Sequence, residues 1–160
     1  MIHSRLAIID LDGRSNQPMF SEDKRFSIVF NGEIYNYKEI RKSLEQKGVS
    51  FQTDGDTEVL LKGFIFHGSN ILQLLRGQFA FAIHDSYEES FFLARDRVGI
   101  KPLYFSIFND VFIFSSELKA IENSGLIQFK PDLDSYVAYL RHLAVPTSRT
   151  GNKNILKLEP

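Results

Sequence analysis

Three consecutive residues, Asn31, Gly32 and Glu33, carry groups that could bind and polarise an amide substrate. Asn31 offers a side-chain amide, and Gly32 allows close approach to its backbone N–H. Two such donors are the parts of an oxyanion hole. The Glu33 carboxylate beside them could hold an ammonium group. A polar loop around a favourable turn glycine is the alternative interpretation of these residues taken alone.

The flanking residues predict where this cluster lies. Alternating apolar residues over 26–30 predict a strand, and the Asn-Gly pair that follows predicts a turn that breaks it. Asn36, with Glu39 three residues later, has the pattern of a helix N-cap and its reciprocal partner. We therefore expect the cluster at a strand end, just before an amphipathic helix over 37–47.

The rest of the chain predicts strands and helices in two groups. Strand candidates between 79 and 115 are joined by short turns, so we expect them to pair antiparallel. A last helix begins at Asp132 and has an apolar face of Leu133, Tyr136, Val137 and Leu140. The predicted fold class is α+β, with two largely antiparallel sheets face to face and helices outside.

Length and composition fit one soluble globular domain. The 160 residues are 43% apolar and 24% charged, which suffices for a core and a solvated surface. A net charge of −1 argues against a nucleic-acid partner. We find no bilayer-spanning run and no signal peptide, so we expect a cytoplasmic protein with no membrane partner. The absence of cysteine excludes disulfides and a cysteine nucleophile within these residues.

Other polar groups form no recognisable catalytic or metal-binding pattern. The four histidines lack metal-ligand spacing, and the acidic residues over 54–58 do not follow the calcium-loop pattern. No phosphate loop or nucleophile elbow is present. Arg95-Asp96-Arg97, followed by Gly99, predicts either an ion-paired corner or a ligand site. Composition and spacing thus predict a type of domain but no reaction.

A series of motifs, in order along nearly the whole chain, resembles the glutaminase domain of glutamine-hydrolysing asparagine synthetases. The motifs are Arg5-Leu-Ala-Ile-Ile-Asp10, Gln17-Pro18-Met19, Asn31-Gly-Glu-Ile-Tyr-Asn36, Phe51-Gln-Thr-Asp-Gly-Asp-Thr-Glu58, Gly77-Gln-Phe-Ala-Phe-Ala82, Ala94-Arg-Asp-Arg-Val-Gly-Ile-Lys-Pro-Leu-Tyr104 and Ser115-Ser-Glu-Leu-Lys-Ala120. The last two favour this branch over the other class II amidotransferases. The resemblance implies an N-terminal-nucleophile (Ntn) hydrolase fold, a four-layer α/β/β/α sandwich, here incomplete at its N-terminus.

The resemblance also implies a role for each residue of a glutamine site. Arg5 matches the arginine that pairs with the substrate α-carboxylate, where a planar guanidinium suits two oxygens. Asn31 and Gly32 match the oxyanion hole, and Glu33 and Asp56 match the acceptors for the substrate α-ammonium. In this family an N-terminal cysteine attacks the glutamine carboxamide, and the released ammonia passes to a second active site.

The chain departs from the family pattern at its start, because the motif around the cysteine nucleophile is missing. We therefore expect no glutamine hydrolysis by these residues alone. Residues 1–145 match a partial type 2 glutamine amidotransferase domain, and 146–160 match the start of a linker to a C-terminal synthetase domain. No cofactor is expected here, because ATP and Mg²⁺ belong to that synthetase domain. The expected partners are L-glutamine and the synthetase domain of the same chain, and a homo-oligomer is a further option.

Two functional hypotheses follow. In the first, the chain is part of a ligase of asparagine biosynthesis, or of a relative that amidates another acceptor, and is inactive only because it is cut. The sequence starts just before a run over 5–11 that predicts a buried strand, and it stops inside a predicted linker. Both ends favour this hypothesis, since natural boundaries usually fall in exposed flexible segments. In the second, the chain is a natural pseudo-amidotransferase that acts as a glutamine sensor or scaffold.

Overall fold

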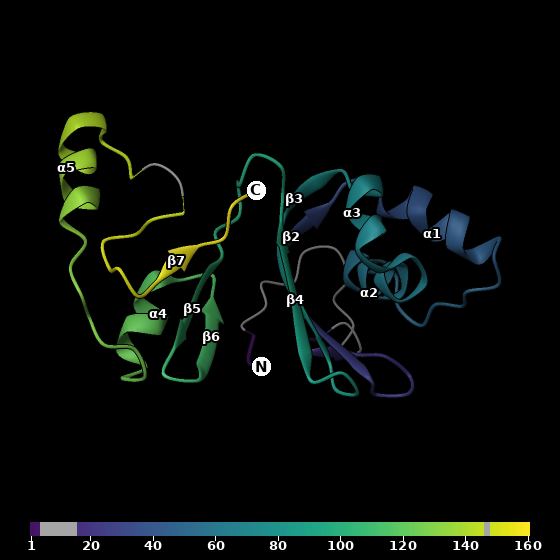
Figure 1. Ribbon diagram of the computed structural model, residues 1–160. Coiled ribbons are helices and arrows are strands. Elements are labelled where there is room, and N and C mark those ends of the chain that lie inside the picture. Colours follow the sequence, from purple (N-terminus) through teal and green to yellow (C-terminus); the bar gives the residue numbers. More distant parts are fainter. Residues whose placement is uncertain (4–15, 146–147) are drawn as a thin grey trace. The chain divides into compact units, whose positions relative to one another are not determined.

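The computed structural model of the chain describes residues 1–3, 16–145 and 148–160. The chain forms two compact units, Met1–Ala94 and Arg95–Pro160 (Figure 1). Each unit contains a sheet with antiparallel strand pairs and helices beside it. The predicted α+β class with antiparallel sheets is therefore confirmed. None of the described helices is long and apolar enough to cross a membrane.

The sheet of the first unit has the strand order β1-β2-β3-β4 (Figure 1). Its long central pair is antiparallel, with Phe26 opposite Asp85 and Ile34 opposite Gly77. Buried apolar side chains lie on both faces of this pair, because successive residues of a strand point to opposite faces. Ile28 and Phe30 lie on one face, and Val29 lies on the other. The strands are β1 (Met19–Phe20), β2 (Phe26–Ile34), β3 (Gly77–Asp85) and β4 (Ser90–Arg95).

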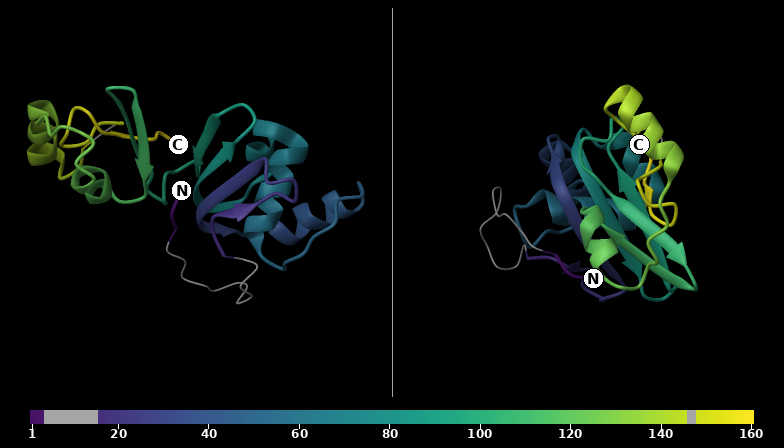
Figure 2. Two further views of the ribbon diagram at one scale, coloured as in Figure 1. Left: turned by 90° about the horizontal axis from the view of Figure 1, so that it is seen from below. Right: turned by 90° about the vertical axis from the view of Figure 1, so that its left-hand side faces the viewer.

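Helices cover one face of this sheet (Figures 1 and 2). They are α1 (Tyr37–Glu45), α2 (Asp56–His67), the short 3₁₀ helix η2 (Gly68–Asn70) and α3 (Ile71–Leu74). Ile40 and Leu44 form the buried stripe of α1, as their spacing predicts. The core between sheet and helices includes Ile28, Phe30, Phe81, Ile83, Leu44, Leu60 and Ile71.

The second unit has a smaller sheet, with strand order β6-β5-β7. Its strands are β5 (Tyr104–Phe108), β6 (Val111–Ser115) and β7 (Leu156–Lys157), and its helices are α4 (Leu118–Asn123) and α5 (Leu133–His142). Ile121, Ile127 and Ile155 are the buried centre of this unit. Residues 148–160, which fall within the predicted linker, pair with β5 through β7. That they lead into a further domain stays a prediction.

The prediction that the strand breaks at Asn31-Gly32 is wrong. β2 continues to Ile34, and Gly32 lies opposite Phe79 within the β2–β3 ladder. Gly32 has a φ of +144°, and a Cβ on it would lie 2.1 Å from the carbonyl oxygen of Gln78. The glycine is therefore required by the close approach of β3 and not by a turn.

The predicted side-chain cap of α1 is also wrong. Asn36 precedes α1 but makes no capping hydrogen bond. Its Nδ2 donates to the carbonyl of Leu74 at 2.9 Å, and its Oδ1 accepts from the N–H of Arg76 at 2.9 Å. The Asn36 side chain thus ties the end of β2 to the segment between α3 and β3.

The predicted apolar face of α5 exists, but it is largely exposed. Leu133 is 70% exposed and Leu140 is 80% exposed, whereas Ser135 is the buried residue of this helix. Helical periodicity correctly located α5 but did not predict which of its residues are buried.

Candidate functional site

One edge of β2 presents backbone N–H groups to side chains rather than to a strand. The N–H of Phe30 donates to Oε1 of Gln17 at 2.6 Å, and the N–H of Ile34 donates to Oδ2 of Asp56 at 3.0 Å. Along a strand, successive N–H groups point to opposite edges. The N–H of Gly32 therefore lies on the same edge, between these two occupied positions.

The opposite edge of β2 confirms this alternation. The N–H of Tyr35 donates to the carbonyl of Arg76 at 2.8 Å, in line with the pairing of β2 to β3. On the Gly32 edge, β1 pairs with β2 only at Ser27 and Ile28. Among the described strands, none covers this edge at Gly32, so no described strand accepts its N–H.

The neighbours of Gly32 are accessible to a ligand. Gly32 and Glu33 are exposed, and Asn31 is half-buried. Within residues 16–145, the Asn31 side-chain amide makes no hydrogen bond that would occupy it. Among the described residues, the Asn31 amide, the Gly32 N–H and the Glu33 carboxylate therefore have no partner at the end of β2.

A second carboxylate reaches this edge from α2. Asp56 is the first residue of α2, is only 6% exposed and is fixed by its bond to the N–H of Ile34. Burial raises the pKa of Asp56 above its ordinary value, and the negative charge of Glu33 raises it further. Backbone N–H groups partly oppose this rise. The site thus holds two mutually repelling acids, which a bound cation would stabilise.

The structure therefore brings together four of the five predicted site residues. Asn31, Gly32 and Glu33 are consecutive in β2, and Asp56 is hydrogen-bonded to the same strand. Arg5, the fifth, lies outside the described residues, so its place in the site stays a prediction.

Gln17 is the residue at this edge whose role the sequence analysis missed. It belongs to no predicted helix or strand, yet its side chain contacts both β2 and the start of α2. Besides accepting from Phe30, its amide Nε2 donates to Oγ1 of Thr57 at 3.4 Å. The Gln17-Pro18-Met19 motif was the available signal in the sequence.

One acidic residue of α2, Glu58, has a structural role. Glu58 is buried and accepts hydrogen bonds from the N–H groups of Gln52 and Thr53. It also forms an ion pair with Lys62 at 3.0 Å. Burial opposes ionisation, but these donors lower the pKa of Glu58 on balance. In the part of the chain that the structure describes, no group of three or more His, Asp or Glu residues is arranged to hold a metal ion.

The Arg95-Asp96 stretch forms a structural corner. Asp96 is 2% exposed and accepts hydrogen bonds from the N–H groups of Ile100 at 2.9 Å and Lys101 at 3.1 Å. The Arg95 guanidinium donates to the carbonyl oxygens of Leu158 and Gly99. Both side chains of this corner are therefore occupied by the backbone of the second unit.

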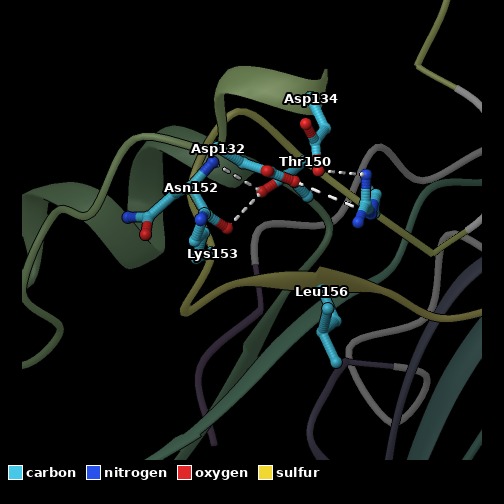
Figure 3. Close-up of a pocket in the computed structure, with 7 residues that line it drawn as sticks. Asp132, Asp134, Thr150, Asn152, Lys153 and Leu156 are labelled. Atoms are coloured by element: carbon cyan, nitrogen blue, oxygen red, sulfur yellow. Dashed lines mark hydrogen bonds and ion pairs between the residues drawn. The ribbon is translucent and has the colours of Figure 1, made fainter. Parts of the chain in front are cut away.

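A polar pocket of about 280 Å³ lies in the second unit (Figure 3). Arg149 lies 3.8 Å from Asp132 and 3.5 Å from Asp134, so the charges in the pocket largely pair with one another. The pocket contains none of the predicted site residues and no recognisable catalytic pattern. It is lined by Asp132, Asp134, Arg149, Thr150, Asn152, Lys153 and Leu156.

Comparison with curated proteins identifies asparagine synthetases as relatives. Asparagine synthetase [glutamine-hydrolyzing] 1 of Bacillus subtilis (strain 168) is 40% identical over 156 residues, which cover 98% of this chain and 24% of that protein. The putative asparagine synthetase [glutamine-hydrolyzing] of Mycobacterium tuberculosis (strain ATCC 25618 / H37Rv) is 39% identical over 166 residues, covering 98% and 25%. The chain spans about a quarter of the length of these relatives.

Comparison with solved structures identifies the same kind of domain. Glutamine phosphoribosylpyrophosphate (PRPP) amidotransferase from B. subtilis, complexed with ADP and GMP, superposes with a TM-score of 0.65 and 29% identity, over 77% of this chain and 28% of that one. The allosteric regulatory enzyme of purine biosynthesis superposes with a TM-score of 0.60 and 30% sequence identity, over 70% of this chain and 26% of that one. Residues 1–160 match the family described as the glutamine amidotransferase domain. The chain therefore belongs to the glutamine amidotransferase domain family, in the class II group related to asparagine synthetase.

Proposed function

We propose that this chain binds L-glutamine and is the glutaminase part of an asparagine synthetase-like amidotransferase. The observation that carries the proposal is the end of β2, where Asn31, Gly32 and Glu33 are consecutive and accessible and Asp56 is hydrogen-bonded to the N–H of Ile34. Glutamine has the matching groups, a carboxamide oxygen that accepts hydrogen bonds and an α-ammonium that pairs with anions.

The proposed binding mode follows from charge and polarity. The α-ammonium lies between Glu33 and Asp56 and relieves the repulsion that raises the pKa of Asp56. The carboxamide oxygen accepts from Gly32 and Asn31. When a nucleophile attacks, this oxygen becomes anionic, and the same two donors bind it more strongly. Arg5 pairs with the α-carboxylate.

The nucleophile for glutamine hydrolysis is not within these residues. The 160 residues contain no cysteine, so the chain supplies substrate-binding groups and oxyanion donors only. We expect the purified chain to release no ammonia from glutamine. A colorimetric or coupled ammonia assay checks this, and release above a protein-free control would contradict it.

The proposal includes a fold and a partner. The proposed fold is that of the Ntn hydrolases, whose complete domain is a four-layer α/β/β/α sandwich, and the antiparallel sheets and the likeness to PRPP amidotransferase support it. Ammonia passes from this domain to an ATP-dependent synthetase domain of the same protein. ATP and Mg²⁺ are bound by that domain and not by these residues.

A second candidate function is a non-catalytic glutamine sensor or scaffold. It is favoured by one observation, the presence of the binding edge in a chain without cysteine. The N-terminal sequence and intact mass of the protein from its native host separate the two. An upstream processed cysteine supports the glutaminase, whereas Met1 as the mature start supports the sensor.

The direct test of glutamine binding is calorimetric titration of the purified chain with L-glutamine, with D-glutamine as the control. The enantiomer has the same groups in an arrangement that cannot satisfy the carboxylates and the edge donors together. We expect saturable binding of the L form and weaker binding of the D form. No binding, or equal binding of both, would contradict the proposal.

A further inference from the structure

We propose that Gln17 is a positioning residue, which fixes the edge of β2 so that, of the backbone N–H groups on this edge, that of Gly32 is presented to the substrate carboxamide. The inference rests on the proposed function, because it concerns the same site. It adds a residue that never contacts the substrate and acts through the backbone of β2.

Gln17 joins the two elements that carry the site. Its Oε1 accepts from the N–H of Phe30 at 2.6 Å, two residues before Gly32, and its Nε2 donates to Oγ1 of Thr57 at 3.4 Å, one residue after Asp56. One half-buried side chain thus holds the oxyanion donor and the ammonium acceptor in a fixed relation.

The Gln17 side chain also continues the pairing of β1 with β2. Met19 lies opposite Ile28, and continuing this register by two residues places Gln17 opposite Phe30. At that position a side chain, and not the backbone, accepts the Phe30 N–H. Gln17 therefore takes the place of a backbone acceptor one step before Gly32 on the same edge of β2.

Because Gln17 occupies the N–H of Phe30, this N–H is not available to a ligand, which limits where along β2 the carboxamide can bind. N–H groups on one edge of a strand repeat about every 7 Å, too far apart for one carbonyl oxygen to contact two of them. Phe30 is bonded to Gln17 and Ile34 to Asp56, and the Gly32 N–H between them has no partner among the described residues. Without Gln17, a carboxamide could bind one step away and lose its alignment with the carboxylates.

The test compares two ligands across three variants of the full chain. L-Glutamine has a carboxamide, whereas L-norvaline keeps the α-ammonium and α-carboxylate and lacks it. Gln17→Leu removes the acceptor, and Gln17→Glu keeps an acceptor for Phe30. Ser21→Ala is the matched control, because Ser21 Oγ accepts the N–H of Phe26 at 2.9 Å on the same edge of β2, farther from Gly32.

We expect Gln17→Leu to weaken glutamine binding about fivefold and norvaline binding less than twofold, the loss of about one neutral hydrogen bond. Gln17→Glu and Ser21→Ala should keep the ratio of the two affinities. A general structural role would lower both affinities alike. An unchanged ratio in Gln17→Leu, or an equal change in Ser21→Ala, overturns the inference alone. No glutamine binding by the unsubstituted chain overturns the proposed function and this inference with it.

Discussion

Asp56 is the most constrained charge of the candidate site. It is buried at the start of α2, bonded to the N–H of Ile34, and within electrostatic range of Glu33. Burial, and then Glu33, raise its pKa, so the carboxylate is less stable than an ordinary one in the absence of ligand. A raised carboxylate pKa of this kind is typical of residues at binding and catalytic sites.

Replacing Asp56 by Asn should weaken L-glutamine binding at least tenfold, since a charge-assisted hydrogen bond is worth about 1.5–3 kcal/mol. Asp54→Asn is the matched control, because the Asp54 side chain is 96% exposed and lies outside the proposed site. We expect less than a twofold change from the control, measured by calorimetry. Equal losses in the two variants would argue for a general charge effect.

Glutamine affinity should fall as the pH drops through the raised pKa of Asp56, because protonation removes one of the two anions. The fall begins at a higher pH than an ordinary aspartate would give. Glu33→Gln removes one cause of the raised pKa, so the fall should move to lower pH in this variant. A pH profile that Glu33→Gln leaves in place would show that another group controls binding.

At the scale of elements, the β2–β3 pair carries the site. The ladder runs without interruption from Phe26 to Ile34 and has glycines where the strands approach most closely. The edge donors are therefore held by a long, buried strand rather than by a loop, which favours a fixed geometry.

Gly32→Ala should destabilise the fold by about 1–3 kcal/mol, because the added Cβ would lie 2.1 Å from the Gln78 carbonyl oxygen and 2.7 Å from the Phe79 Cα. Gly151→Ala is the control, since its Cβ would meet Tyr136 at an ordinary 3.4 Å. Urea unfolding measures both. A Gly32 variant as stable as the Gly151 variant would contradict the close approach of the two strands.

The Arg25–Asp85 ion pair closes the other end of this ladder, with contacts of 2.9 Å and 2.7 Å. The guanidinium holds the pKa of Asp85 at about 2, below its ordinary 3.8. Since the folded pKa is the lower one, the stabilisation is present above the ordinary pKa and is lost as the pH falls towards 2. The stability difference between the unsubstituted chain and Asp85→Asn should therefore be constant near neutral pH and shrink between about pH 4 and pH 2. A difference that persists at pH 2 would assign it to another cause.

At the scale of the whole molecule, each unit has its own buried apolar cluster. The described residues of the candidate site all belong to the first unit. The chain also corresponds to only about a quarter of its asparagine synthetase relatives. Under our proposal, this chain supplies glutamine recognition to an asparagine synthetase-like amidotransferase.

The exposed face of α5 gives a prediction for the second unit. Leu140→Ser should change the free energy of unfolding by less than about 0.5 kcal/mol, because Leu140 is 80% exposed. Ile121→Ala, at a fully buried position, should cost about 2–5 kcal/mol. Thermal or urea unfolding compares the two variants. A large cost at Leu140 would mean that α5 packs against another part of the chain.

The sequence predicted the elements better than their ends. Alternating and helical periodicity located β2, α1 and α5, because burial determines both patterns. The pair Asn31-Gly32 misled because it is a turn signal, whereas here glycine is required by a strand that lies far along the chain. Local pattern cannot show such a contact.

The residues of the candidate site were predictable from their types, but the contacts that hold them in place were not. Asn31, Gly32 and Glu33 carry suggestive chemistry side by side, and the resemblance adds Asp56. Gln17 belongs to one of the resembling motifs, but its contacts could not be predicted, because its partners lie 13 and 40 residues away in the sequence. Only the fold brings it to the edge of β2.

The most direct test of the central claim is to follow the backbone amide of Gly32 by ¹⁵N NMR while L-glutamine is added to the purified chain. Our account predicts a saturable shift of the Gly32 resonance, with the side-chain amide of Asn31 moving in parallel. L-Norvaline should shift neither to the same extent. If glutamine binds without moving Gly32, or does not bind at all, the edge of β2 is not a glutamine site.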